Sequence, residues 1–260
     1  MVDQSDGPDP QLERAAAESS RIDVVREAGR GLSRARNAGL ERAATEWVVF
    51  VDDDCVVEAD WADRLAEALA KHPDVDLVAG HASEGAVPAR DYVAASSLAV
   101  ERERVLRGRF THPGIVAFGT SFAVRRSAAQ RLGGWDERLG PGIADFPAAD
   151  DMDFNYRLLA AGGRAFQTPS VRVRHEQWRP PAELPSLYRG YLKAWSGFAA
   201  KTLKGGDVLG AVWLWSIAVV DVLDMAASAV TMRSTLRASI AAAKALGLVE
   251  GTIRGLRRRW

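Results

Sequence analysis

Apolar positions between residues 1 and 180 repeat with helical spacing in some segments and form short strand-like runs in others. The helical spacing predicts helices over residues 10–20, 32–44, 60–72 and 148–163, and a helix within residues 126–140 that the paired glycines Gly133 and Gly134 stop. Apolar and β-branched runs predict strands over residues 22–25, 46–51, 75–80, 114–124 and 171–175. Because helices and strands alternate in this way in α/β proteins, we expect a central, mainly parallel sheet covered by helices.

The pattern changes after Pro180 and Pro181, where alanine-rich helical segments containing tryptophan replace the alternation. We therefore place a domain boundary near residue 180, with a helical extension over residues 181–260. Its longest apolar stretch, residues 208–220, is shorter than the about 20 residues that a membrane-spanning helix needs. We expect this stretch to lie on a surface and not to cross a membrane.

The end of the chain is locally basic, with seven arginines and lysines against Glu250 over residues 232–260. A basic helical edge that carries tryptophan fits contact with an anionic membrane surface. Packing of the same helices on the first domain or on a second subunit fits the sequence equally well. Both interpretations of the extension therefore stay open.

Composition narrows the possible partners and compartments. The 34 basic and 34 acidic residues cancel, so the whole molecule has no field that would recruit nucleic acid. The single cysteine, Cys55, excludes an internal disulfide and a cysteine-based zinc cluster. Residues 1–10 lack the pattern of a signal peptide. We expect a cytoplasmic protein, and a membrane-contacting extension would place it at the inner face of the plasma membrane.

Three aspartates, Asp52, Asp53 and Asp54, directly follow the apolar strand predicted over residues 46–51. Ligands of open α/β sheets bind at the carboxyl ends of the strands, so these side chains should face a crevice. Adjacent carboxylates repel one another unless a cation lies between them, and oxygen ligands suit Mg²⁺ or Mn²⁺. The alternative is an acidic turn that only ends the strand.

A second acidic cluster, Asp150, Asp151 and Asp153, opens a predicted helix, and His175 ends the last predicted strand. Acids at a helix N-terminus interact favourably with the helix dipole, which alone would explain the cluster. A lone histidine is more often structural than a metal ligand. A shared site formed by both acidic clusters and His175 is the alternative interpretation.

Together these segments resemble glycosyltransferase family 2 with the GT-A fold, from residue 2 to about residue 180. The segments that carry the resemblance are GRGLSRARNAGLERAATEWVVFVDDDC, FGTSFAVRRSAAQRLGGWDERLGPG, AADDMDFNYRLLAAG and VRVRHE. The resemblance implies a nucleotide-diphospho-sugar transferase fold, with a Rossmann-like mixed sheet flanked by helices. Residues 1–180 would form this domain, followed by the C-terminal helical extension.

The resemblance also implies a role for each candidate residue. Asp54, with Asp52 and assisted by His175, would hold Mg²⁺ or Mn²⁺ on the donor diphosphate, and Asp151 would be the general base. The nucleotide-sugar donor would contact Asp3, Arg36, Asn37, Asp52 and Asp53. One base and one displacement imply an inverting transfer to a hydroxyl of a glycan or lipid-linked acceptor.

One departure from the family pattern concerns the N-terminus. Members begin with an apolar strand before the segment that resembles residues 2–9, and this chain starts at Met1 without it. We therefore expect an N-terminally incomplete domain with an exposed sheet edge and weakened donor binding. A non-catalytic, degenerate relative that acts as a binding or scaffold protein is the main alternative function. A metal-dependent phosphohydrolase is a further one, because clustered aspartates also serve two-metal chemistry.

Overall fold

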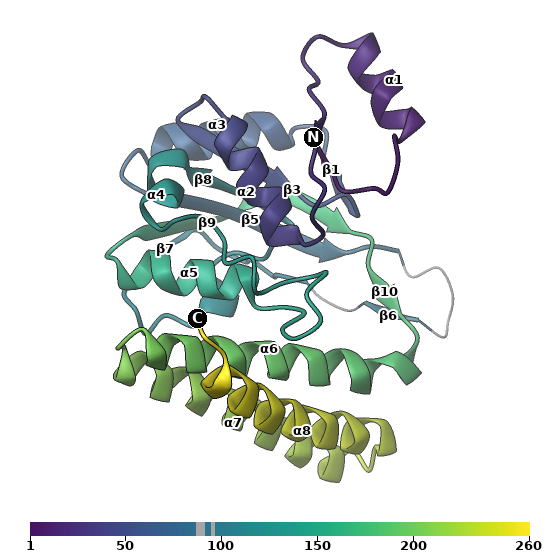
Figure 1. Ribbon diagram of the computed structural model, residues 1–260, viewed down its shortest axis with the longest axis vertical. Helices are drawn as coiled ribbons and strands as arrows, with labels where there is room; N and C mark the ends of the chain where they lie inside the picture. The colour runs from purple at the N-terminus through teal and green to yellow at the C-terminus, as the bar shows by residue number, and fades with distance from the viewer. Residues whose placement is uncertain (87–91, 95–96) are drawn as a thin grey trace.

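The structure, a computed structural model, describes residues 1–86, 92–94 and 97–260. A central sheet lies between helices, and three long helices form a further layer on the side of the molecule away from the N-terminus (Figure 1). The chain termini lie on different layers, with the C-terminus at the end of the helical layer.

The central sheet is mixed. Its strands lie in the order β3 (Trp47–Val51), β8 (Ser121–Arg125), β5 (Leu77–Glu84), β9 (Arg164–His175) and β4 (Cys55–Val57), and β7 (Arg104–Arg107) also pairs with β9. β5 and β9 are parallel, whereas the pairs β3–β8, β5–β8, β4–β9 and β7–β9 are antiparallel. The expectation of a mainly parallel sheet is therefore wrong, and the mixed sheet that the family resemblance implied is confirmed. Alternation of helices and strands does not reveal that β8 enters between β3 and β5 in the opposite direction.

The helices between residues 1 and 180 form where the spacing predicts them, with shorter bounds. They are α1 (Pro10–Glu18), α2 (Leu32–Arg42), α3 (Trp61–Lys71), α4 (Arg126–Arg131) and α5 (Asp150–Ala160). The helix that begins at residue 126 ends at Arg131, just before the paired glycines expected to stop it, and Gly133 and Gly134 both take positive φ angles.

Two predicted strands also differ in extent. The strand predicted over residues 22–25 shrinks to β2 (Val25–Arg26), which pairs in parallel with β1 (Val2–Asp3). Within 114–124 the strand begins only at residue 121, after a 3-10 turn, η1 (Pro113–Ile115). A second two-stranded sheet joins β6 (Val93–Ala94) and β10 (Trp178–Arg179).

An aromatic core fixes α5 against the central sheet. Trp135 stacks on Phe154 of α5 with ring centroids 4.2 Å apart and packs edge-on against Phe50 of β3. Phe122 of β8 completes the group. Trp135, Phe122 and Phe154 are buried, so they hold the first turn of α5 at a fixed position over the sheet.

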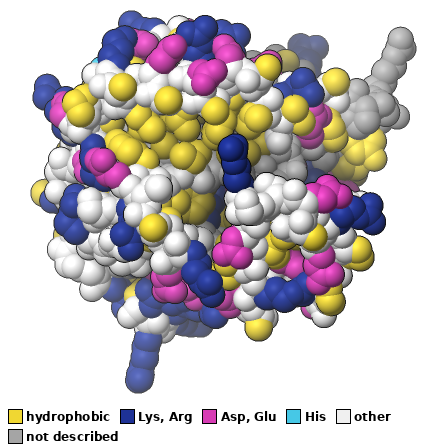
Figure 2. Space-filling model, turned by 90° about the horizontal axis from the view of Figure 1, so that it is seen from above, with side chains coloured by type: hydrophobic (Ala, Val, Ile, Leu, Met, Phe, Trp, Pro, Cys, Tyr) yellow, Lys and Arg dark blue, Asp and Glu magenta, His cyan; other side chains and the backbone are white. Residues whose placement is uncertain are grey.

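β3 is the terminal strand of the central sheet, and it pairs with β8. Val49 and Val51 of β3 are each 40% exposed. Seen from the end of the molecule that carries α1 and α3, hydrophobic side chains gather in a hollow between charged lobes (Figure 2). A strand edge with exposed valines is a template for pairing with a further strand.

The extension consists of α6 (Leu184–Lys204), α7 (Val208–Thr231) and α8 (Thr235–Arg257), preceded by a 3-10 turn, η2 (Pro181–Glu183). α6 shares a buried core with the preceding part of the chain, in which Phe198 packs with Phe146 and Tyr156. α7 is long and apolar enough, by length and composition alone, to be considered for crossing a membrane, and 22% of its most apolar window is buried.

The contact between α6 and α8 depends on glycines. Gly247, Gly251 and Gly255 recur at every fourth position on α8, and a Cβ at Gly251 would overlap the carbonyl oxygen of Lys193 on α6. We expect Gly251→Val to lower the free energy of unfolding by about 2–3 kcal/mol, because the two backbones must move apart. Urea unfolding monitored by circular dichroism measures this change. Gly7→Ala, where an added Cβ meets nothing within 4 Å, is the control, and equal midpoints for both variants would contradict the expectation.

Candidate active site

The three aspartates form a tight turn between β3 and β4. The backbone N–H of Asp52 donates to the carbonyl of Thr120 at 3.0 Å, and the N–H of Cys55 donates to the carbonyl of Asp52 at 3.1 Å. Asp53 is exposed, whereas Asp52 and Asp54 are partly buried. The turn thus places Asp52 and Asp54 against the protein and Asp53 toward solvent.

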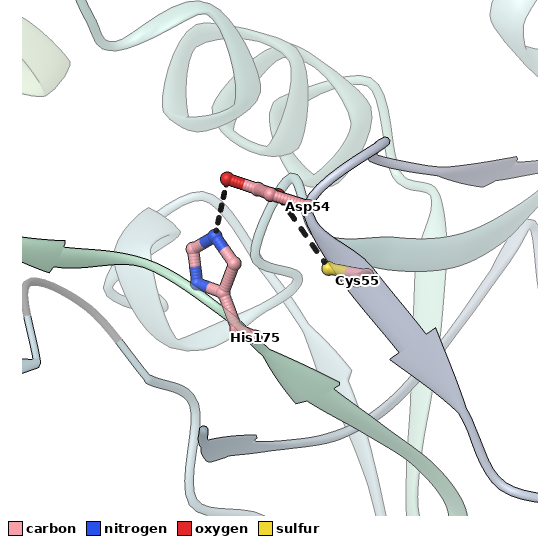
Figure 3. A group of neighbouring side chains, drawn as sticks. All are labelled: Asp54, Cys55 and His175. Carbon is pink, nitrogen blue, oxygen red and sulfur yellow. Dashed lines mark hydrogen bonds and ion pairs between the residues drawn. The ribbon is translucent and has the colours of Figure 1, made fainter. Parts of the chain in front are cut away.

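Asp54 lies beside His175, which ends β9 (Figure 3). The Oδ2 atom of Asp54 is 3.2 Å from Nε2 of His175, and the backbone of Cys55 pairs in register with that of His175. One ligand atom from each of Asp54, Cys55 and His175 lies within 4.8 Å of the others. The antiparallel pairing of β4 with β9 therefore brings together residues 121 positions apart in the chain.

The chemistry of these donors fits a hard divalent cation. Burial and the charges of Asp52 and Asp54 raise the pKa of Cys55 to about 12, so its thiol stays protonated at neutral pH. Thiolate is a soft ligand that Mg²⁺ and Mn²⁺ do not favour, which leaves the carboxylate of Asp54 and the imidazole of His175 as the donors suited to them. Mg²⁺ and Mn²⁺ accept oxygen and imidazole ligands and keep further positions for phosphate or water.

Arg36 of α2 links the two acidic clusters. Its guanidinium, which is 3% exposed, lies 2.7 Å from Oδ2 of Asp150 and 3.2 Å from Oδ1 of Asp52. It also donates to the carbonyl of Gly119 at 3.0 Å. Burial raises the pKa of Asp52 and so does the charge of Asp54, while Arg36 opposes both effects. Without the buried cation, Asp52 and Asp150 would lose their shared partner.

Asp151 lies at the first turn of α5, close to the same glycine. Its Oδ2 accepts a hydrogen bond from the N–H of Gly119 at 3.1 Å, and its Oδ1 accepts one from the N–H of Met152 at 2.8 Å. Burial and the neighbouring charge of Asp150 raise the pKa of Asp151 to about 7, against the opposing charge of Arg36. A carboxylate with a pKa near neutrality can both take and release a proton under ordinary conditions.

Gly119 therefore connects the clusters through its two backbone groups. Its carbonyl accepts from Arg36, which holds Asp52, and its N–H donates to Asp151. A Cβ at this position would lie 2.7 Å from the Arg36 guanidinium, so any other residue here would make the guanidinium shift. The chain of bonds Asp52–Arg36–Gly119–Asp151 joins the predicted metal-binding turn to the predicted base.

Two predicted donor-binding residues use their side chains inside the protein. The guanidinium of Arg36 bonds Asp52 and Asp150. The side-chain amide of Asn37 donates to the backbone carbonyl of Trp135 at 2.9 Å and accepts from the backbone N–H of Trp135 at 2.8 Å. A further bond joins Asn37 to Glu137 at 3.2 Å. Asn37 thereby holds the turn that precedes the aromatic core, away from the aspartate turn.

Asp3 lies apart from the other candidates, on β1. The N–H of Ser5 donates to its Oδ1 at 2.9 Å and helps to lower its pKa. Its Oδ2 lies 3.5 Å from Arg26 and has no hydrogen-bond partner among the described residues, although Asp3 is only 6% exposed. A buried oxygen without a hydrogen bond is a group that a ligand N–H could satisfy.

Asp153, the third acid of its cluster, has a structural role. Its carboxylate lies 2.8 Å from Arg157 of the same helix and 2.7 Å from Lys201 of α6, and it is 1% exposed. The ion pair with Lys201 attaches α6 to α5. The helix-terminal interpretation of the cluster therefore describes Asp153, while Asp150 and Asp151 are linked through Arg36 and Gly119 to Asp52 of the aspartate turn.

A cavity of about 400 Å³ opens near the start of α6. It is lined by Pro147, Arg179, Glu183, Ser186, Leu187, Gly190 and Tyr191. Burial raises the pKa of Tyr191, and the charges of Tyr188 and Asp151 act in the same direction. A larger, more open polar cavity of about 570 Å³, between Glu58 and Arg172, does not include the acidic clusters.

Comparison with known proteins identifies the family. The family model described as "Glycosyl transferase family 2" matches residues 2–133 of this chain. This chain belongs to glycosyltransferase family 2. A curated relative, the pre-mycofactocin glycosyltransferase of Mycobacterium tuberculosis, is 31% identical over 185 residues, which are 68% of this chain and 34% of the relative. The chain thus spans about a third of the length of this family 2 relative.

Other similar proteins agree with the GT-A fold. N-acetylgalactosaminyltransferase 6 of Drosophila melanogaster is 27% identical over 62% of this chain and 25% of its own length. Among solved structures, the mannosyltransferase PcManGT from Pyrobaculum calidifontis, in complex with GDP-Man and Mn²⁺, superposes with a TM-score of 0.57 at 18% identity. That match covers 98% of this chain and 76% of PcManGT. GalNAc-T7 with UDP, GalNAc and Mn²⁺ gives a TM-score of 0.50 at 17% identity, over 74% of this chain and 40% of its own.

Sequence reasoning missed three features of this family 2 site. Cys55 lies within the group around His175, Gly119 joins the clusters through its backbone, and Tyr191 borders the cavity at the start of α6. Adjacency to Asp54 was a signal for Cys55. No sequence signal distinguishes Gly119 or Tyr191 from other glycines and tyrosines, because their roles depend on contacts between distant segments.

Proposed function

We propose that this chain is an inverting, metal-dependent glycosyltransferase that moves a sugar from a nucleotide-diphosphate donor to a hydroxyl of a glycan or lipid-linked acceptor. The observation that carries the proposal is the link through Arg36 and Gly119, which joins the aspartate turn to Asp151. Family membership supports the same reaction class. The proposed compartment is the cytoplasm, at the inner face of the plasma membrane.

In the proposed site, Asp54 and His175, together with Asp52, would hold Mg²⁺ or Mn²⁺. When bound, this ion supplies positive charge that stabilises the diphosphate leaving group. Arg36 keeps Asp52 in place next to Asp150. Two solved structures of similar fold contain Mn²⁺ with a nucleotide sugar or a nucleotide, which supports the choice of cation for this chain.

Asp151 is the proposed general base. The N–H groups of Gly119 and Met152 orient its carboxylate, and it accepts the proton of the acceptor hydroxyl as that oxygen attacks the anomeric carbon. The bond from this carbon to the donor diphosphate breaks in the same displacement, so the configuration inverts. The cavity lined by Arg179 and Tyr191 is the proposed entry of the acceptor.

The proposed donor contacts follow from burial. The buried Oδ2 of Asp3, which accepts no hydrogen bond from a described residue, would accept an N–H of the nucleotide base, and the exposed Asp53 would lie toward the donor. Arg36 and Asn37 contribute indirectly, since their side chains hold Asp52 and the turn at Trp135.

Release of nucleoside diphosphate from uridine, guanosine and thymidine diphosphate sugars in the presence of Mn²⁺ tests the proposal. We expect release from at least one donor, and we expect EDTA to abolish it, because the leaving diphosphate then lacks the cation that neutralises it. No release from any donor, with or without Mn²⁺, would refute a catalytic role for this chain.

A non-catalytic binding protein is the second candidate. One similar protein, 26% identical over 60% of this chain, is named inactive polypeptide N-acetylgalactosaminyltransferase-like protein 5, of Macaca fascicularis. Calorimetry with uridine, guanosine and thymidine diphosphates separates the two candidates. The transferase requires Mn²⁺-dependent binding of one nucleotide, whereas the scaffold interpretation predicts no metal-linked binding.

A further inference from the structure

The outward side of α7 is mostly apolar along the length of the helix. Its exposed residues recur every three or four positions, and among them Leu209 is 71%, Leu223 is 61% and Val230 is 78% exposed. The exposed charge on this side is Asp224. An apolar stripe of this length on a water-facing helix is larger than the scattered apolar residues of ordinary surfaces.

α8 adds a second apolar stripe next to the first. Leu246, Val249, Ile253 and Leu256 are between 44% and 56% exposed and share one side of the helix by their spacing. α7 and α8 pack on one another and on α6, and they form the side of the molecule away from α1 (Figure 1). We call the exposed residues of these two helices the α7–α8 surface.

The inner side of α7 is fastened to the rest of the protein. Gly210, Ala211, Leu214 and Ala218 are buried, and the indole N–H of Trp195 on α6 donates to the carbonyl of Leu214 at 2.8 Å. The indole N–H of Trp215 on α7 donates to Thr252 Oγ1 on α8 at 3.1 Å. The helix would have to break these contacts to cross a bilayer, so the geometry suits a helix that lies along a surface.

The N-terminus of α7 is also anchored to the domain that carries the candidate active site. Asp207 caps the helix by accepting from the N–H of Gly210 at 3.0 Å. The hydroxyl of Tyr156 on α5 donates to Oδ2 of Asp207 at 2.5 Å. Arg109 forms an ion pair with Oδ1 of Asp207 at 3.2 Å. The direction of α7 is therefore fixed relative to the acidic clusters.

Unpaired cations lie at the ends of the α7–α8 surface. Arg233 lies in the turn between the helices, Arg257 follows Ile253 by one helical turn, and Arg259 lies just beyond α8. These three exposed arginines form no ion pair with any described residue, whereas Arg254 and Arg258 are paired with Asp145. Apolar residues flanked by free cations match the acyl region and the anionic headgroups of a lipid surface.

A second copy of the chain matches this surface less well. A twofold dimer presents the same patch from both partners, so it would bring two sets of unpaired arginines to one interface. On the α7 stripe of each copy, Asp224 is an exposed acid that could balance these arginines. An anionic headgroup layer offers a counter-charge to every arginine at once.

We propose that the α7–α8 surface docks this protein on an anionic lipid surface, with α7 lying in the plane of the interface. The docking does not rest on the proposed transferase activity, and it is measured without any sugar donor. Lipid docking gives a role to exposed residues of α7 and α8 that take no part in the proposed reaction at Asp54 and Asp151.

Co-sedimentation of the full chain with vesicles tests the docking. We expect binding to vesicles of phosphatidylcholine mixed with phosphatidylglycerol, weaker binding to phosphatidylcholine alone, and a loss of binding at high salt. The double variant Leu209→Gln, Leu223→Gln should weaken binding by about tenfold or more, because two large apolar side chains no longer enter the acyl region. Val105→Gln, on an exposed valine of β7, is the matched control and should bind as the wild type does.

A second double variant separates charge from apolar contact. Arg257→Gln with Arg259→Gln should weaken binding to the anionic vesicles by about fivefold for each arginine and leave binding to phosphatidylcholine unchanged.

The variants alter exposed side chains, and unfolding curves that match the wild type verify their fold. Vesicle binding that is absent, or unchanged in the Leu209 and Leu223 variant, overturns the proposal. A dimer in solution that this variant dissociates would identify a second copy as the occupant instead.

Discussion

Asp151→Asn should lower kcat for sugar transfer by about 10²–10⁴-fold while leaving the KM for the donor nearly unchanged. The single oxygen of the amide can accept from only one of Gly119 and Met152, which bond separate oxygens of the Asp151 carboxylate, and the amide cannot take a proton. Steady-state kinetics with the donor identified by the panel measures both constants. A fall in donor affinity with unchanged kcat would contradict the assignment of Asp151 as the base.

The same substitution has a pH signature. Because the pKa of Asp151 is raised to about 7, wild-type activity should increase as the pH rises through 7 and the carboxylate ionises. The unfolded chain ionises this group at lower pH, so the wild type loses stability between its ordinary pKa and pH 7. Asp151→Asn escapes that loss and should melt a few degrees higher than the wild type at pH 8, with a smaller difference at pH 5.

A matched control distinguishes the site from a generic helix effect. Asp63 also lies in the first turn of a helix, α3, and is exposed. Asp63→Asn should change neither kcat nor the pH profile, because its carboxylate faces solvent. A pH profile that is flat between 6 and 8 in the wild type would show that the proton goes to another group.

The positions of the candidate residues follow from the sequence because each one stands at the end of a regular element. Asp52 and Asp54 follow an apolar strand, Asp151 opens a helix with apolar spacing, and His175 closes a strand. The carboxyl ends of strands collect ligands in this fold class, so nearness could be expected. The antiparallel register of Cys55 with His175 then decides that His175 meets Asp54 and not another aspartate.

The internal use of Arg36 and Asn37 could not be predicted. In the sequence both are polar residues on a helix with few apolar positions, which is equally compatible with contact to a nucleotide. Burial of Arg36 to 3% depends on β8 and α5 closing over α2, and these segments are far apart in the chain. The helical pattern predicts which side of α2 faces the protein interior. It does not predict which charged residues lie opposite that side.

Strand direction and the outer side of α7 were also beyond the sequence, for different reasons. Hydrophobic runs look alike in parallel and antiparallel strands, so the insertion of β8 between β3 and β5 leaves no local signal. α7 is apolar nearly all around, so its composition fits a buried helix as well as one on a surface. The packing of α6 and α8 on one side of it leaves Leu209 and Leu223 exposed.

Asp54→Ala should raise the Mn²⁺ concentration needed for half-maximal activity by about 10–100-fold or more, because it removes a carboxylate oxygen that lies 3.2 Å from His175 Nε2. His175→Gln should have a smaller effect, since Asp54 and Asp52 keep the charge of the site. Titration of activity with Mn²⁺ at saturating donor measures the shift, and isothermal calorimetry of Mn²⁺ with a nucleoside diphosphate measures it without turnover.

Cys55 provides a discriminating comparison within the same group of side chains. Mn²⁺ favours oxygen ligands over a soft sulfur, so Cys55→Ser should shift the Mn²⁺ titration much less than Asp54→Ala. If both variants shift it equally, the thiolate is a ligand, and the site should then favour a softer metal such as Zn²⁺ over Mn²⁺. If neither variant shifts it, the cation binds away from His175, and the metal site must be sought around Asp52 and Asp53, nearer to the buried charge of Arg36.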